Sequence, residues 1–250
     1  MTKIVVFDSG LGSLSVIKPI RKRIKADIIY FADQKNYPYG TKTISQLDKI
    51  IKSTIIQLQE KFEPDIIVVG SNTPSLLLDI EKKDKIIGVF PPLKEAVQST
   101  KSGKIGILAT KSVVENKILD RYIRKNVPSI IHVKKINATP LVDLVESGKF
   151  ISQKQIAKNI IKKIITPYIE NNVDVFTLSS THLPFLILIL KELFPGITFL
   201  DPADALTQYI SNISKHKSKK SSLKIYSSGN TESFHKQLLK IGIKNKVNPL

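Results

Sequence analysis

The stretch Lys3-Ile-Val-Val-Phe-Asp8-Ser9-Gly10 decides the fold class, because an apolar run ends abruptly in small polar residues. Similar runs recur at residues 3–7, 27–31, 65–69, 85–89, 104–108, 130–135, 173–178, 197–200 and 223–226. Most are nearly continuous in Ile, Val and Leu, as in strands that helices cover on both faces. Amphipathic stretches separate them, most clearly at residues 44–62 and 153–170. The sequence therefore predicts an α/β protein with parallel sheets.

Two pairs of segments look like copies of each other. Residues 3–9 resemble residues 104–110 (KIGILAT), which lie 101 positions later. Residues 69–74 (VGSNTP) resemble residues 178–184 (LSSTHLP), in which Ser180 lies 109 positions after Ser71. The repeat predicts an internal duplication, with two similar α/β halves that each contain a strand ending in small hydroxyl residues.

The composition excludes several classes of protein. The chain has 250 residues, no cysteine, and 39 Lys and Arg against 21 Asp and Glu, a net charge of +18. Without thiols there is no disulfide framework, Cys-ligated zinc, iron–sulfur cluster or Cys nucleophile. No apolar run has the length of a membrane span, and the first residues do not resemble a signal peptide. We expect a cytoplasmic protein with no membrane partner.

Cofactor, metal and nucleic-acid sites are not indicated. The lysines are spread along the chain, and the one cluster, residues 215–220 (KHKSKK), has no interleaved aromatic residues, so we interpret it as a solvated loop. His132, His216 and His235 lie apart from carboxylate clusters, which predicts no metal site. Gly10 and Gly12 are only a fragment of a dinucleotide-binding fingerprint.

Polar residues follow four of the predicted strands at once. They are Asp8, Ser9, Ser71, Asn72, Thr73, Thr110, Ser180, Thr181 and His182. Ligands of open parallel sheets bind beyond the carboxyl ends of the strands, so these residues predict a site for a small anionic ligand. The alternative interpretation is that each residue only caps the following helix.

The same residues resemble those of a known family. Residues 7–16 (FDSGLGSLSV) are similar to the opening signature of glutamate racemase, and Tyr30-Phe31-Ala32-Asp33 with Pro38-Tyr39-Gly40 to its next block. Residues 71–73 (SNT), 105–110 (IGILAT), 140–142 (PLV) with 146–148 (ESG), 178–184 (LSSTHLP), 201–203 (DPA) and 228–229 (SG) continue the series in order. The resemblance extends from about residue 4 to residue 234.

The resemblance implies two similar flavodoxin-like, three-layer domains related by a pseudo-twofold axis, with an active-site cleft between them. The first would be discontinuous, residues 1–92 plus 207–250, and the second would span residues 93–206. It also implies a homodimer with a small-molecule ligand, glutamate or a similar acidic amino acid.

The family mechanism needs no cofactor: one thiolate removes the α-proton of glutamate, and a thiol opposite delivers a proton to the other face. By position, the resemblance assigns catalytic roles to Ser71, Ser180, Asp8, Glu146 and His182. It assigns substrate binding to Ser9, Pro38, Tyr39, Gly40, Asn72, Thr73, Thr110 and Thr181.

The sequence departs from the family at its two catalytic positions, because Ser71 and Ser180 stand where the family has cysteine. A hydroxyl is far less acidic than a thiol, so two-base proton transfer loses its matched groups on both faces. His182, with Asp8 opposite, is a possible substitute base. The serines fit an engineered variant, a natural member that lost the chemistry, or one that acquired another reaction.

Three hypotheses follow. The first is a glutamate racemase-like protein that interconverts L- and D-glutamate, with its turnover placed in question by the two serines. The second is a catalytically inactive homologue that binds glutamate or another small dicarboxylate as a sensor or interaction protein. The third is a nucleic-acid or protein partner surface created by the basic charge.

Overall fold

The computed structural model describes residues 2–80, 85–214 and 221–250 and divides into two compact units. The first unit combines Met1–Val89 with Ala203–Leu250, and the second is Phe90–Pro202. The basic cluster at residues 215–220, which includes His216, lies outside the described residues. In the three described ranges, no helix is both long and apolar enough to cross a membrane.

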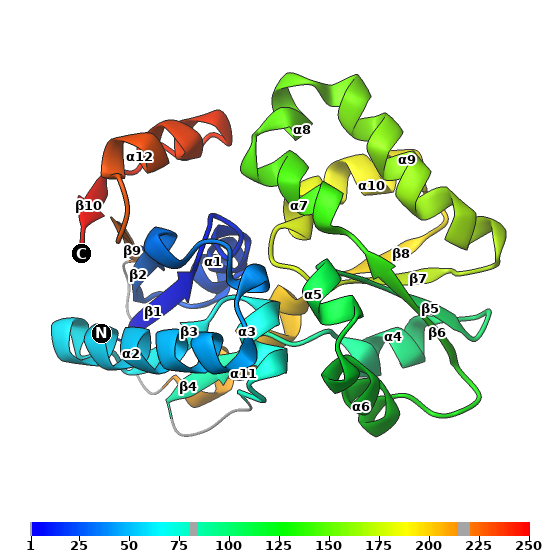
Figure 1. Ribbon diagram of the computed structural model, residues 1–250, viewed down its shortest axis with the longest axis horizontal. Coiled ribbons are helices and arrows are strands. Elements are labelled where there is room, and N and C mark those ends of the chain that lie inside the picture. Colours follow the sequence, from blue (N-terminus) through cyan, green and yellow to red (C-terminus); the bar gives the residue numbers. More distant parts are fainter. Residues whose placement is uncertain (1, 81–84, 215–220) are drawn as a thin grey trace. The chain divides into compact units, whose positions relative to one another are not determined.

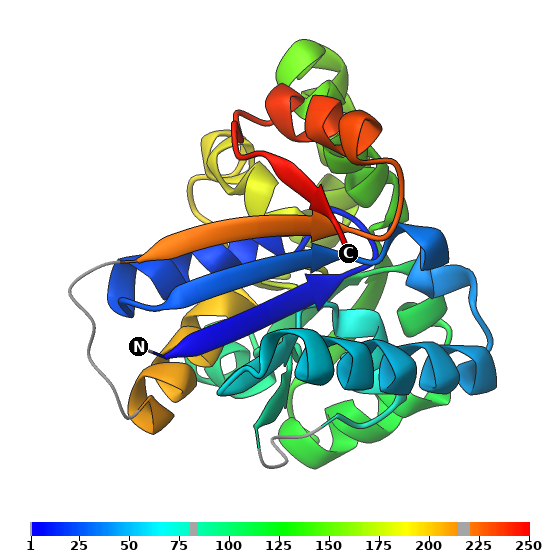
Figure 2. The same cartoon turned by 90° about the vertical axis from the view of Figure 1, so that its left-hand side faces the viewer.

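The first unit is built on a six-stranded sheet of order β10-β9-β2-β1-β3-β4, in which all neighbouring strands are parallel. The strands are β1 (Lys3–Asp8), β2 (Asp27–Ala32), β3 (Ile66–Val69), β4 (Ile86–Gly88), β9 (Ser222–Ser227) and β10 (Val247–Pro249). Figure 2 shows β9, β2 and β1 side by side, so the end of the chain completes a sheet begun by its start. The central strands β1 and β3 are almost wholly buried, as expected for a sheet covered on both faces.

The helices of the first unit connect these strands (Figure 1). They are α1 (Leu14–Arg23), η1 (Gln34–Asn36), η2 (Tyr39–Thr41), α2 (Ile44–Phe62), α3 (Asn72–Leu77), α11 (Pro202–Ile213) and α12 (Thr231–Lys240). Helix α2 starts at a capping box in which Thr43 and Gln46 bond each other's backbone amides. It buries Leu47, Ile51 and Leu58, an apolar face at helical spacing.

The second unit is built on a four-stranded parallel sheet of order β6-β5-β7-β8. Its strands are β5 (Lys104–Ala109), β6 (His132–Asn137), β7 (Val175–Leu178) and β8 (Thr198–Leu200). Its helices are α4 (Leu93–Ser99), α5 (Lys111–Val114), α6 (Lys117–Asn126), α7 (Thr139–Glu146), α8 (Lys149–Ser152), α9 (Lys154–Glu170), η3 (Leu183–Leu186) and α10 (Ile187–Leu193). Phe176 on β7 and Phe199 on β8 stack with ring centroids 5.6 Å apart inside this unit.

The two sheets repeat the same strand order. In the first unit β2-β1-β3-β4 are neighbours in the order in which β6-β5-β7-β8 are neighbours in the second. Strand β5 starts 101 residues after β1, and β7 starts 109 residues after β3, which are the offsets found in the sequence. The shared order supports the predicted duplication.

Individual hydrogen bonds also recur at the same offsets. Lys3 Nζ donates to Phe62 O at 2.7 Å, and Lys104 Nζ donates to Asn171 O at 3.0 Å. These donors lie 101 residues apart and the acceptors 109.

A second pair of bonds places the strand ends in register. Gly70 N donates to Phe7 O at 2.8 Å, and Ser179 N donates to Leu108 O at 2.9 Å. Beyond these bonds the sequence offset of 109 residues makes Ser71 correspond to Ser180, and Thr73 to His182.

The α/β fold with parallel sheets is confirmed, and each of the nine expected strands is present near its predicted position. The strand expected at residues 130–135 begins only at His132, where its pairing with Lys104 of β5 begins, and Ile130 before it is 80% exposed. A tenth strand, β10, was not predicted because its sequence, Val-Asn-Pro, has one apolar strand former. It lies at the sheet edge, where proline is tolerated.

Candidate functional site

The residues that follow β7 form a buried hydrogen-bonded chain in the second unit. Ser180 Oγ lies 3.4 Å from His182 Nδ1, and His182 Nε2 lies 2.6 Å from Glu146 Oε1. Glu146 is the last residue of α7, so the chain joins the end of a helix to the end of a strand. Ser180 is 5% exposed, and the side chains of His182 and Glu146 are 10% and 11% exposed.

This arrangement fixes the chemistry available to the imidazole. With Nε2–H donating to the Glu146 carboxylate, Nδ1 carries the lone pair that faces Ser180. A neutral imidazole held in this way accepts a proton at Nδ1, and the carboxylate stabilises the imidazolium that forms. The imidazole of His182 therefore has the hydrogen-bond arrangement that a general base requires.

The corresponding position in the first unit carries no histidine. Ser71 precedes α3, and Thr73 occupies the position that corresponds to His182. The main-chain oxygen of Ser71 accepts from Ser75 Oγ at 2.7 Å. The two predicted serines thus each follow a residue with the same strand pairing, and they differ in the residue two positions later.

Asn72 places a buried acceptor beside Ser71. Its Nδ2 donates to Val89 O at 3.0 Å, which fixes the orientation of the amide. Its Oδ1 is buried and has no hydrogen-bond partner among the described residues, and Asn72 as a whole is 3% exposed. Buried acceptors are normally satisfied, so Oδ1 calls for a donor such as a ligand ammonium.

Asp8, Ser9 and Tyr39 lie together at the end of β1. Asp8 Oδ1 accepts from Ser9 N at 2.7 Å, and Ser9 Oγ accepts from Tyr39 N at 3.4 Å. All three residues are at most 5% exposed. The segment that carries Pro38, Tyr39 and Gly40 is therefore attached to the end of the central strand.

A second attachment of this segment was not predicted from the sequence. The Asp33 carboxylate accepts from Asn36 Nδ2 at 3.0 and 2.8 Å, from Tyr39 Oη at 3.0 Å and from Ser228 Oγ at 3.2 Å. Asp33 is 3% exposed. Ser228 comes from the last part of the chain, 195 residues away, so only the folded structure shows the contact.

Burial raises the pKa of the Tyr39 phenol well above its ordinary value, and the nearby carboxylates of Asp33 and Asp8 raise it further. The phenol remains protonated across the neutral range. It therefore acts as a hydrogen-bond donor to Asp33 and not as an anion.

The remaining predicted residues are hydroxyl groups at strand or helix ends. Thr110 precedes α5, and its Oγ1 lies 3.2 Å from Ser112 Oγ. Thr73 and Thr181 are buried, at 6% and 2% exposure. Of the predicted residues, Asp8, Ser9, Pro38, Tyr39, Gly40, Ser71, Asn72 and Thr73 belong to the first unit, and Thr110, Glu146, Ser180, Thr181 and His182 to the second.

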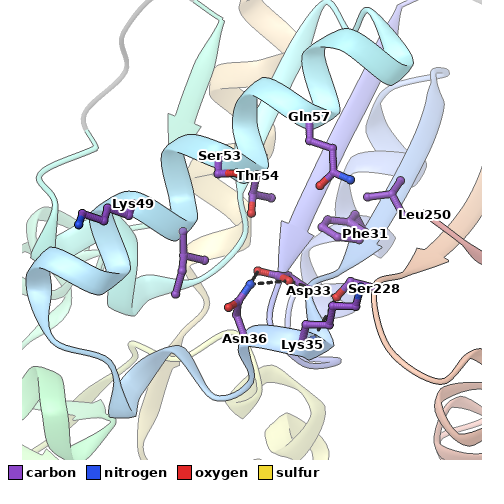
Figure 3. Close-up of a pocket in the computed structure, with 11 residues that line it drawn as sticks. Phe31, Asp33, Lys35, Asn36, Lys49, Ser53, Thr54, Gln57, Ser228 and Leu250 are labelled. Carbon is purple, nitrogen blue, oxygen red and sulfur yellow. Dashed lines mark hydrogen bonds between the residues drawn. The ribbon is translucent and has the colours of Figure 1, made fainter.

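A cavity of about 350 Å³ lies in the first unit. Its lining is Phe31, Asp33, Lys35, Asn36, Lys49, Ile50, Ser53, Thr54, Gln57, Ser228 and Leu250, none of which was predicted as a site residue. Figure 3 shows Asn36 turned toward Asp33, and Thr54 and Gln57 on helix α2 opposite these two residues. The cavity borders the Asp33 network that holds Tyr39.

Within the described parts of the chain, no three His, Asp or Glu side chains are grouped as a metal ion would require.

Sequence comparison finds relatives that are glutamate racemases. No family model matches the sequence. The glutamate racemase of Deinococcus radiodurans is 32% identical over 83% of this chain and 73% of its own length. The glutamate racemase of Aliivibrio fischeri is 33% identical over 84% of this chain and 80% of its own length.

Solved structures show the same fold. A glutamate racemase isoform from Bacillus anthracis superposes with a TM-score of 0.83 at 22% identity, covering 100% of this chain and 97% of its own. The Escherichia coli glutamate racemase, solved with L-glutamate and an activator, superposes with a TM-score of 0.81 at 24% identity, covering 100% of this chain and 98% of its own.

Proposed function

Because the chain belongs to the glutamate racemase family, we propose that it binds glutamate and exchanges the α-proton of this amino acid through His182. The observation that carries the proposal is the buried His182–Glu146 pair, in which a carboxylate 2.6 Å from the imidazole supports its protonation. The reaction needs no cofactor, since the imidazole itself takes and returns the proton.

We propose exchange on one face of the α-carbon, without efficient racemisation. The position two residues after Ser180 is a histidine, whereas the position two residues after Ser71 is Thr73, and the substitute base expected opposite His182 is the carboxylate of Asp8. A carboxylate is a much weaker base than an imidazole, and a serine hydroxyl is not a base at neutral pH. Proton removal and return therefore both run through His182, and the configuration is retained.

The proposed roles follow from chemistry and position. His182 is the base, and Glu146 positions it. The family resemblance extends the proposed catalytic roles to Ser180, Ser71 and Asp8. The unpartnered Asn72 Oδ1 accepts from the substrate ammonium. The other proposed substrate-binding residues are Ser9, Pro38, Tyr39, Gly40, Thr73, Thr110 and Thr181.

Binding of the amino acid is tested by isothermal titration calorimetry with L-glutamate, D-glutamate and L-aspartate. We expect binding of glutamate, weakened about 10-fold or more by Asn72→Leu, because a hydrogen bond to a charged group is lost. Asn159→Leu, on the exposed surface of α9, is the control and leaves affinity unchanged. Thermal unfolding verifies that both variants fold. Failure of every dicarboxylate to bind would contradict the proposal.

The specific alternative is a binding-only homologue, favoured by the absence of an imidazole at the Thr73 position of the first unit. It predicts glutamate binding with no α-proton exchange at all.

Two further proposals concern assembly. We propose two racemase-like domains, residues 1–92 with 207–250 and residues 93–206. The compact units support this division, since their boundaries lie after Val89 and after Pro202.

We also propose a homodimer, supported by the family membership alone. Light scattering after size-exclusion chromatography tests this assembly. A mass of 28.0 kDa, that of one chain, would contradict the dimer.

A further inference from the structure

We propose that Ser180 is a covalent nucleophile, activated by His182 and positioned through it by Glu146, that transfers acyl groups from small carboxylic esters. This activity differs from proton exchange on glutamate, since here the serine oxygen itself forms a bond to the substrate. It uses the same imidazole but does not depend on glutamate binding.

The geometry has the three parts of a serine nucleophile system. The hydroxyl lies 3.4 Å from a ring nitrogen, and the other ring nitrogen lies 2.6 Å from a carboxylate. Nucleophile and base within hydrogen-bond reach, with the base oriented by a third group, define such a system irrespective of the order of residues in the chain. The longer first distance is in the range of systems without bound substrate, where catalytic hydrogen bonds are often long.

Burial makes this base effective. The imidazole and carboxylate side chains are only 10% and 11% exposed, so water competes little for their hydrogen bond. Ser180 stands at the carboxyl end of β7, where ligands of a parallel sheet bind. The neighbouring Ser179 is not a competing nucleophile, because it is 1% exposed and its hydroxyl bonds Thr177 Oγ1 at 2.8 Å.

The proposed reaction consumes only the ester and one molecule of water. Ser180 Oγ attacks the ester carbonyl carbon while its proton passes to His182 Nδ1. The C–O bond to the leaving alcohol breaks, and that alcohol takes the proton from Nδ1. Water then hydrolyses the serine ester, with His182 as base again, and releases the carboxylic acid and the free serine.

The duplication supplies an internal comparison. Ser71 corresponds to Ser180 in backbone register but has Thr73 in place of His182. If strand-end position alone made a serine reactive, both would react alike. The proposal assigns reactivity to Ser180 only.

The test is labelling of the full-length protein with an alkyl fluorophosphonate, in which the serine oxygen displaces fluoride from phosphorus. Mass spectrometry of peptides reports the label separately at Ser180, at Ser71 and at the exposed Ser99. We expect Ser180 to be labelled and the other two to remain at background. His182→Gln should slow labelling of Ser180 about 100-fold, and Glu146→Gln at least about 10-fold.

Two results would overturn the inference. One is labelling of Ser180 no faster than that of Ser99 in the unmodified protein, and the other is labelling that His182→Gln and Glu146→Gln leave unchanged. Thermal unfolding verifies that both variants fold. The comparison of Ser180 with Ser99 needs only the unmodified protein.

Different results would contradict the serine nucleophile and the proposed function. Glutamate binding and exchange without labelling would remove the nucleophile and leave the proposed function standing. Labelling of Ser180 by a protein that binds no dicarboxylate would do the reverse.

Discussion

At the scale of single residues, two serines hold equivalent places at the ends of β3 and β7, but their neighbours differ. Ser180 faces the imidazole of His182, whereas Ser71 is followed by Thr73 at the corresponding position. This asymmetry separates what the two units can do chemically, and it can be measured directly.

The absence of cysteine makes a clean measurement possible, because one introduced thiol is then the only thiol in the protein. We expect the thiol introduced by Ser180→Cys to react faster with iodoacetamide at pH 7 than that introduced by Ser71→Cys. The His182–Glu146 pair should lower the pKa of the first below the ordinary value of about 8.5. Equal pH–rate profiles for the two variants would contradict this expectation.

Asp33 is expected to position Tyr39 and the segment that follows it. Asp33→Asn removes the charge and cannot accept the same set of four hydrogen bonds. We expect glutamate affinity to fall about 10-fold, the effect of losing one to two kcal/mol of hydrogen bonding. Calorimetry measures this effect, with Asp48→Asn on α2, where the side chain is 40% exposed, as control. Unchanged affinity in Asp33→Asn would show that the network is only structural.

The raised pKa of Tyr39 predicts that the folded protein loses stability at alkaline pH. Its pKa is raised in the folded protein by burial and by Asp33 and Asp8, whereas in the unfolded chain it stays near 10.0. The unfolded state therefore loses its proton first, and the stability associated with the neutral phenol, complete below pH 10, decreases as pH rises beyond it.

Urea unfolding between pH 8 and pH 11 tests this effect. Tyr39→Phe should flatten the dependence, and the half-buried Tyr168→Phe in the second unit should not. An equally steep decline in Tyr39→Phe would assign the effect to other groups.

At the scale of elements, the packing of β5 against its neighbours depends on Gly106. A Cβ at this position would lie 2.5 Å from Phe176 Cδ1 and 3.1 Å from Ile136 Cδ1, in the buried core of the second unit. We expect Gly106→Ala to lower the free energy of unfolding by about 1–3 kcal/mol through overpacking. Gly196→Ala, where nothing lies within 4 Å, is the matched control and should be nearly neutral. Denaturant unfolding of both variants measures the difference.

The elements most accessible to prediction were those with strong local patterns. Helix α2 was expected at residues 44–62 and spans Ile44–Phe62, because its apolar spacing and capping box coincide. Strand β10 was missed because its pairing with β9 decides its conformation more than its own residues do.

The candidate site was predictable only in part. Glu146 and His182 were expected to act together, and the structure places them 2.6 Å apart. The Asp33–Ser228 contact was not foreseen, since no local pattern joins residues 195 positions apart. The unpartnered oxygen of Asn72 likewise depends on three-dimensional burial.

At the scale of the whole molecule, the net charge of +18 acts against folding. Like charges repel across the surface, and salt screens them because the Debye length falls from about 30 Å at 0.01 M to about 10 Å at 0.1 M. We expect the free energy of unfolding to rise between 0.01 and 0.1 M NaCl, and equally in KCl. Constant or falling stability would show that the positive charges are locally compensated.

The duplication gives the molecule two corresponding strand ends, and the one after β7 is followed by His182 where the one after β3 is followed by Thr73. The central claim is that glutamate chemistry runs through this end alone. The direct measurement is incubation with L-glutamate or D-glutamate in heavy water, following the α-proton by NMR and the configuration by chiral chromatography. We predict exchange of one enantiomer with retained configuration, abolished by His182→Gln. Rapid interconversion of both enantiomers, or exchange that persists without His182, would contradict the account.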